Sequence, residues 1–113
     1  MIKIDESGRI QLVRKDTGSF TITPKCEDGE VYRLKDGEFV RFIVYIYPEK
    51  PIMQKDSSVQ AEDGSIEFYL TSADTDLPET TYGYRAKLIG SDGEEIDRID
   101  TFIGAENGKF EVI

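Results

Sequence analysis

Carboxylates are the side chains of this chain whose spacing could do chemistry. Asp74, Asp76 and Glu79 lie close together, and carboxylate oxygens are ligands that Ca²⁺ prefers. Their order does not match an EF-hand loop, and no glycine follows at the required offset. Acidic residues are also favoured in the first turn of a helix, because the helix dipole attracts negative charge there. We therefore predict a helical turn at this point, with no metal and no cofactor.

A second group of acids surrounds a Ser-Asp-Gly turn, and it consists of Asp92, Glu94, Glu95 and Asp97. Two carboxylates can hydrolyse a glycosidic bond, but these lie at an expected hairpin tip without a groove of aromatic residues. A solvated turn is the better interpretation. The chain has no histidine to activate a hydroxyl, and its one cysteine, Cys26, lies beside acidic residues that disfavour the reactive thiolate. We predict that the protein is not an enzyme.

Tyrosines give the best indication of a binding surface. Several are expected to project from the polar faces of strands, where a ring can stack on a sugar or become buried in a protein interface. The alternative is ordinary half-buried tyrosine at a sheet edge. Residues 52–55 are expected to form an unpaired edge segment, which can pair with a neighbouring chain. The candidate interface residues are therefore Tyr32, Tyr45, Tyr47, Ile52, Met53 and Tyr69.

The stretch that must position these residues is 39–47, which we expect to be the central strand. Successive side chains of a strand point to opposite faces, so one face carries Val40, Phe42, Val44 and Ile46, all apolar. The other face, on which Tyr45 lies, is mixed and tolerates partial exposure. β-branched and aromatic residues dominate both faces, which is typical of a strand and not of a helix.

The rest of the chain has the same character, with short alternating segments divided by Asp-Gly and Asn-Gly turns. A hydroxyl followed by acids predicts one helical turn at 72–77, and the broken alternation after residue 94 predicts a bulge or bend. We predict an all-β fold, an antiparallel β-sandwich with one short helical turn, formed by residues 1–113 as a single domain. A closed barrel is the alternative. Further strands are expected at 1–5, 10–13, 20–23, 31–34, 65–71, 82–89, 94–103 and 110–113.

The charge balance of the chain limits the classes of partner that the protein can bind. The chain of 113 residues has 14 basic and 23 acidic residues, which gives a net charge of -9. A field of that sign repels phosphate backbones and anionic lipid, so we expect neither nucleic acid nor membrane as a partner. The start of the chain lacks the apolar core of a signal peptide, and no apolar run reaches membrane-spanning length. We therefore expect the protein to be made and folded in a cytoplasm.

A series of motifs runs through residues 13–112 in a characteristic order. It begins with Lys-Asp-Thr-Gly-Ser-Phe at 15–20 and Leu-Lys-Asp-Gly-Glu at 34–38, and continues with Leu-Pro at 77–78 and Tyr-Gly-Tyr at 82–84. In this order the series resembles the small immunoglobulin-like domains of tailed-phage and prophage structural proteins, such as the N-terminal domain of baseplate upper proteins. Residues 79–81 lengthen a loop that is tighter in that family.

The resemblance implies an immunoglobulin-like sandwich that docks onto other virion or tail proteins or onto copies of itself, with no catalytic residues. Synthesis in a bacterial cytoplasm and a location in the virion would follow from it. A carbohydrate-binding or adhesion module of a bacterial surface protein is the alternative, motivated by the tyrosines. An immunoglobulin-like protease inhibitor rests on fold analogy alone.

Overall fold

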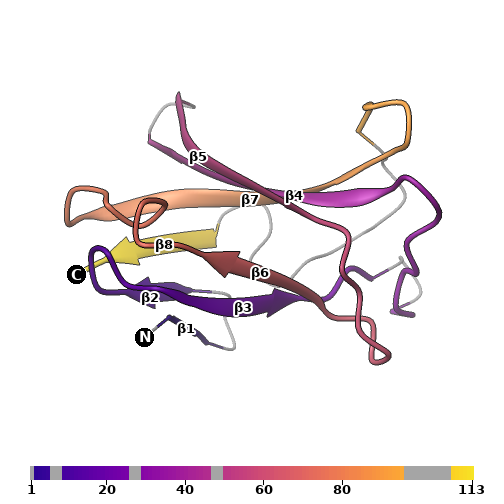
Figure 1. The fold of residues 1–113 in the computed structure, drawn as a ribbon, viewed down its shortest axis with the longest axis horizontal. Helices are drawn as coiled ribbons and strands as arrows, with labels where there is room; N and C mark the ends of the chain where they lie inside the picture. The colour runs from indigo at the N-terminus through magenta and orange to yellow at the C-terminus, as the bar shows by residue number, and fades with distance from the viewer. Residues whose placement is uncertain (1, 6–8, 26–28, 47–49, 96–107) are drawn as a thin grey trace.

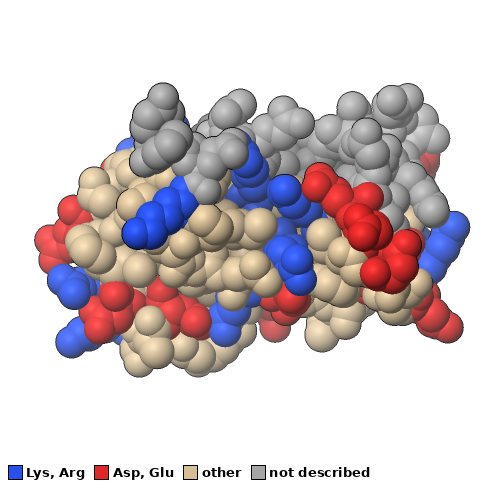
Figure 2. All heavy atoms as spheres, turned by 90° about the horizontal axis from the view of Figure 1, so that it is seen from above, with Lys and Arg blue, Asp and Glu red and all other residues tan. Residues whose placement is uncertain are grey.

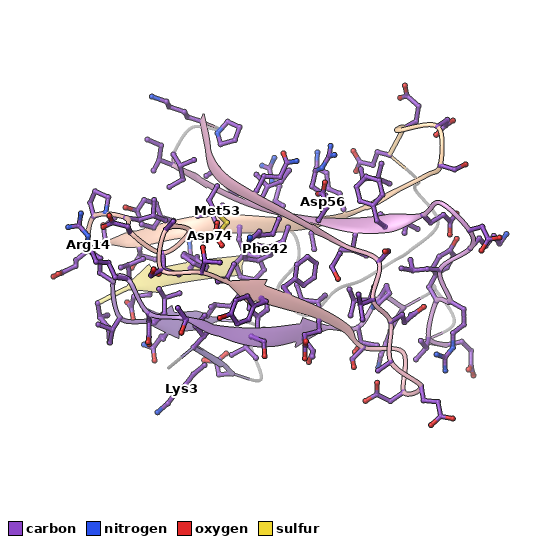
Figure 3. All side chains as sticks on the ribbon, viewed as in Figure 1. Lys3, Arg14, Phe42, Met53, Asp56 and Asp74 are labelled. Atoms are coloured by element: carbon purple, nitrogen blue, oxygen red, sulfur yellow. The ribbon has the colours of Figure 1, made fainter. Side chains whose placement is uncertain are left out.

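The computed structural model describes residues 2–5, 9–25, 29–46, 50–95 and 108–113, and these form two packed layers of β-strands (Figure 1). One layer is a six-stranded sheet with the order β1-β2-β8-β7-β4-β5, and the other is the two-stranded sheet β3-β6. The described part of the chain contains no helix that is long and apolar enough to cross a membrane. The strands are β1 (Lys3–Ile4), β2 (Ile10–Leu12), β3 (Gly18–Ile22), β4 (Phe39–Ile46), β5 (Lys50–Ser57), β6 (Ile66–Leu70), β7 (Thr81–Ile89) and β8 (Gly108–Val112).

The prediction of an all-β sandwich is confirmed, but the sheet is not wholly antiparallel. Strands β2 and β8 run parallel, with Ile10 opposite Phe110 and Leu12 opposite Val112. The other ladders between named strands are antiparallel. A parallel pair needs a long connection between its strands, and here almost the whole chain lies between them. Alternation of side chains, from which the strands were predicted, carries no information about strand direction.

Strand β4 is central, as predicted, because it pairs with β5 on one side and with β7 on the other. Val40, Phe42 and Val44 are completely buried, whereas the residues between them are half-buried. Ile46, the last of the four apolar residues predicted to share one face, is 37% exposed. The register of the β4–β5 ladder shifts between Val44 and Tyr45.

Aromatic rings from both layers meet at the centre of the sandwich. The ring of Phe42 lies 5.0 Å from that of Phe20, 5.7 Å from Phe68, 5.1 Å from Tyr84 and 6.0 Å from Phe110. The predicted meeting of Phe42, Phe68 and Tyr84 in one interior is therefore confirmed. Burial, together with the negative charge of Asp5, raises the pKa of Tyr84 to about 12, so this hydroxyl stays neutral in the core.

Two predicted turns are present, and one predicted strand is not. Gly37 and Gly93 have φ angles of 83° and 84°, which suit glycine in the tight connections before β4 and after β7. Residues 31–34 contribute only a single bridge, between Val31 and Lys25. At 72–77, where a helical turn was predicted, the structure has one backbone hydrogen bond of helical spacing, from the Thr75 N–H to the Thr71 carbonyl. The bulge expected at 94–103 lies largely outside the described residues.

A buried tyrosine fixes the entry to β7. The Tyr82 hydroxyl donates to the Pro78 carbonyl over 2.7 Å, and the residue is 5% exposed. Desolvation by burial raises the pKa of Tyr82, so the hydroxyl remains a donor. The bond fastens the connection from β6 to the start of β7.

Candidate functional site

The outer face of the six-stranded sheet carries the most plausible contact surface among the described residues. It is formed on β4 by Phe39, Arg41, Ile43 and Tyr45, all half-buried. The register places Arg85 of β7 opposite Ile43. We call these five residues the β4–β7 face. Two aromatic rings, one branched aliphatic chain and two guanidinium groups are typical of residues that contribute most to binding at protein interfaces.

Tyr45 is held in place by two neighbours on β7. The Arg85 guanidinium lies 4.8 Å from the centre of the Tyr45 ring, a cation–π arrangement. Beneath the ring is Gly83, directly opposite Tyr45 in the ladder. A Cβ atom on Gly83 would lie 2.6 Å from Tyr45 Cζ, so any larger residue displaces the ring. Neither Gly83 nor Arg85 was among the predicted site residues, because only the β4–β7 register brings them to Tyr45.

The other end of the β4–β7 face is organised by Arg41. Its guanidinium lies 5.4 Å from the centre of the Phe39 ring and forms an ion pair with Asp56 of β5, with 3.0 Å between Nε and Oδ1. Beside this pair, the segments 37–39 and 56–58 line an open hollow of about 280 Å³. The hollow includes the buried Glu38, whose carboxylate accepts hydrogen bonds from the Tyr32 hydroxyl and the Lys35 N–H, each over 2.8 Å.

The structure does not bring the predicted interface residues together. Tyr69, on the outer face of β6, is 58% exposed, but it belongs to the opposite layer from Tyr45. The expectation that Tyr32 projects from the polar face of a strand is wrong, because Tyr32 is 8% exposed and its hydroxyl is bonded to the buried Glu38. A sequence pattern that showed Tyr32 in a short strand could not reveal this polar partner. Tyr47 lies outside the described residues.

Ile52 and Met53 lie on β5, which is an edge strand as predicted and longer than the expected 52–55. Both are partly buried against the core, so neither presents a fully exposed apolar side chain. Met53 is opposite Val44, whereas Pro51 is opposite Tyr45, and Ile52 is the extra residue at the register shift. The shift explains how adjacent residues of one strand can both contact the interior.

The acidic residues near 74 are separated by their ion pairs. Asp74 accepts hydrogen bonds from the N–H and hydroxyl of Thr71 over 2.8 and 2.9 Å, and it contacts Lys55 Nζ at 2.8 Å. Asp76 pairs with Arg14 instead. Partial burial raises the pKa of Asp74, but the bonds from Lys55 and Thr71 outweigh it, and the pKa lies below its usual value. Among the described residues no three acids or cysteines are arranged to hold a metal ion.

No protein-family model, curated protein or solved structure matches this chain at a significant level. The surface chemistry described above is therefore the basis for a functional proposal.

Proposed function

We propose that this protein is a non-enzymatic assembly module, an immunoglobulin-like domain of a phage or prophage tail or baseplate that docks onto other virion proteins. The observation that carries the proposal is the β4–β7 face, where two ordered aromatic–arginine pairs flank Ile43. Interfaces are enriched in aromatic residues and arginine, and residues already held in place lose little entropy on binding. This favours protein docking over the binding of a sugar.

The immunoglobulin-like part of the proposal is supported by strand order. Immunoglobulin variable-type domains have strands C′, C, F and G in one sheet and pair B with E in the other. With β3 to β8 taken as B, C, C′, E, F and G, the observed sheets have this arrangement. Such domains also have a tyrosine near the start of strand F that bonds to the backbone a few residues upstream, as Tyr82 does with Pro78.

The carbohydrate-binding alternative has less support from the geometry. A sugar platform needs aromatic rings exposed on one surface. The two predicted rings that the structure describes as outward-facing, Tyr45 and Tyr69, belong to opposite layers, and Tyr45 is covered in part by Arg85. We therefore do not carry this alternative further.

The test is to co-express the chain with the product of each neighbouring gene and to measure co-purification. We expect at least one of them to be retained by the wild-type chain. Ile43→Lys should weaken that binding at least about tenfold, because it places a charge at the centre of the β4–β7 face. Circular dichroism and thermal unfolding must show that the variant is folded.

A matched control is Tyr69→Lys, which makes the same change of charge on the opposite layer and should bind as wild type. The proposal fails if no neighbouring gene product is retained, or if Ile43→Lys binds as well as Tyr69→Lys. Neighbouring genes that encode no virion proteins would overturn the phage assignment even if docking is observed.

A further inference from the structure

The outer edge of β3 carries backbone groups that no other described residue bonds. Glu67 of β6 turns both its N–H and its carbonyl away from β3, since they bond to the Val59 carbonyl (3.3 Å) and the Ser57 hydroxyl (2.7 Å). Thr21 is opposite Glu67 in the ladder. In an antiparallel pair, opposite residues turn their backbone groups both toward or both away from each other. The N–H and carbonyl of Thr21 therefore point away from β6.

The same alternation turns the backbone of Ser19 outward, because it is two residues from Thr21. Within the described part of the chain, no hydrogen bond reaches the outward groups of Ser19 or Thr21, and both residues are exposed. Figure 1 shows β3 with this edge turned away from β6, and β1 below its beginning. The side chain of Ile2 lies beside Gly18, the first residue of the strand.

This edge lacks the features by which proteins prevent strands from pairing. Such features are charged side chains, especially lysine, proline within the strand, and bulges. The eight residues from Thr17 to Pro24 contain no charge, and the β3–β6 ladder has no register shift. An uncharged edge of regular geometry is a template for another strand.

We propose that the edge of β3 pairs antiparallel with β3 of a second copy, about a two-fold axis at Thr21. The pairing would join two two-stranded sheets into one sheet of four strands. This inference concerns a different layer from the β4–β7 face and does not depend on the proposed function.

A second copy fits this edge because the sequence around Thr21 is self-complementary. In this register Thr21 faces Thr21 of the copy, and Ser19 faces Thr23 of the copy, one residue beyond the end of the strand. Opposed threonine and serine hydroxyls can form hydrogen bonds across a ladder. Residues 18–24 are paired only with one another, so the register places no two like charges directly opposite each other.

Two physical limits define how strong the dimer is. Each copy has a net charge of -9, so the copies repel at long range, and added salt screens this repulsion. The contact is one short strand, which is small compared with a stable interface. The dimer is therefore weak, and it strengthens with salt.

The experiment is sedimentation equilibrium of the whole chain over a series of concentrations at low and high salt. We expect a monomer–dimer equilibrium whose dissociation constant falls as salt rises. Thr21→Lys should weaken the dimer at least about tenfold, because two ammonium groups meet at the two-fold axis. Gln54→Lys makes the same change of charge on the exposed edge strand β5 and should dimerise like wild type.

A cross-linking measurement tests the register independently of affinity. In a Cys26→Ser background, Thr21→Cys should form a disulfide-linked dimer on mild oxidation, because opposed Cα atoms in a hydrogen-bonded pair are about 5.5 Å apart. Gln54→Cys in the same background should not. The proposal is overturned if wild type stays monomeric at all concentrations, if Thr21→Lys and Gln54→Lys dimerise equally, or if the two cysteine variants cross-link equally.

Discussion

Strands β3 and β5 both lie at the edge of a sheet, yet they differ in length, in the burial of their side chains and in the residues that prevent pairing with another strand. β5 has eight residues, and its side chains are half-buried or exposed. It carries Lys50, Pro51 and Lys55, and its ladder contains a register shift. β3 has five residues, and its Phe20 and Ile22 are buried in the core.

The difference shows that one edge strand is held by core contacts, whereas the other is held by its ladder and is protected against pairing with other chains. β5 has little core contact of its own, so its place depends on the ladder to β4 and on ties such as the ion pair between Lys55 and Asp74. A long edge of this kind needs charges and a proline to prevent unwanted pairing. β3 is held by the core and leaves its outer edge uncharged. The two edges therefore give different responses to substitution.

The largest expected difference between the two strands is the loss of stability when a side chain that contacts the core is truncated. Phe20→Ala removes a ring that lies 5.0 Å from Phe42 and 5.5 Å from Phe68, and it should lower the free energy of unfolding by about 3–5 kcal/mol. Met53→Ala on β5 should cost at most about 2 kcal/mol, because Met53 is only partly buried. Urea unfolding measures both. Equal losses would show that β5 is anchored by the core as firmly as β3.

A smaller loss of stability is expected when the ion pair between Lys55 of β5 and Asp74 is removed. Asp74→Asn removes the ion pair with Lys55 and weakens the bonds from Thr71, which should cost about 1 kcal/mol at neutral pH. The native pKa of Asp74 is lowered, so its stabilisation is complete above the unfolded pKa and is lost as pH falls through the native pKa. The unfolding curves of wild type and variant should therefore converge only at a pH below the native pKa of Asp74, which itself lies below the ordinary value of 3.8.

The control for Asp74→Asn is Asp76→Asn, which removes a carboxylate charge from the same turn. Its ion pair with Arg14 is more exposed, so the change in stability should be close to zero. An Asp76→Asn variant as destabilised as Asp74→Asn, or a gap that persists at acid pH, would contradict the role given to Asp74.

The smallest effect concerns the protection of β5. Replacing Lys50 and Pro51 together by threonine restores a backbone donor and removes a charge from the edge. We expect self-association to increase by a few-fold over wild type, measured by sedimentation in the Thr21→Lys background so that β3 does not contribute. Unchanged association would mean that the register shift and Lys55 protect this edge without help.

Much of the fold was accessible from the sequence, because alternation reports which side chains face the core. Phe42, Phe68 and Tyr84 were placed in one interior by this rule, and their rings do meet. The rule fails where a polar partner is buried too. Tyr32 has the pattern of an outward tyrosine, but its hydroxyl donates a hydrogen bond to the buried Glu38 carboxylate.

The candidate site was less accessible. Tyr45 was identified correctly as an outward residue of the central strand, whereas Arg85, which covers its ring, is forty residues further along the chain. The residues of β7 that face Tyr45 depend on the register of the ladder. Register is a property of two strands together, so the pattern of either strand alone does not contain it.

The sequence by itself determined that this chain forms strands, where most turns lie and which side chains of each strand are apolar, because these follow from the period of neighbouring residues and from glycine in tight connections. Only the tertiary structure decided which strands pair, that β2 and β8 run parallel, and which edges stay open. The physical reason is that every residue except proline offers the same backbone N–H and carbonyl, so the local pattern of one strand does not say which other strand pairs with it.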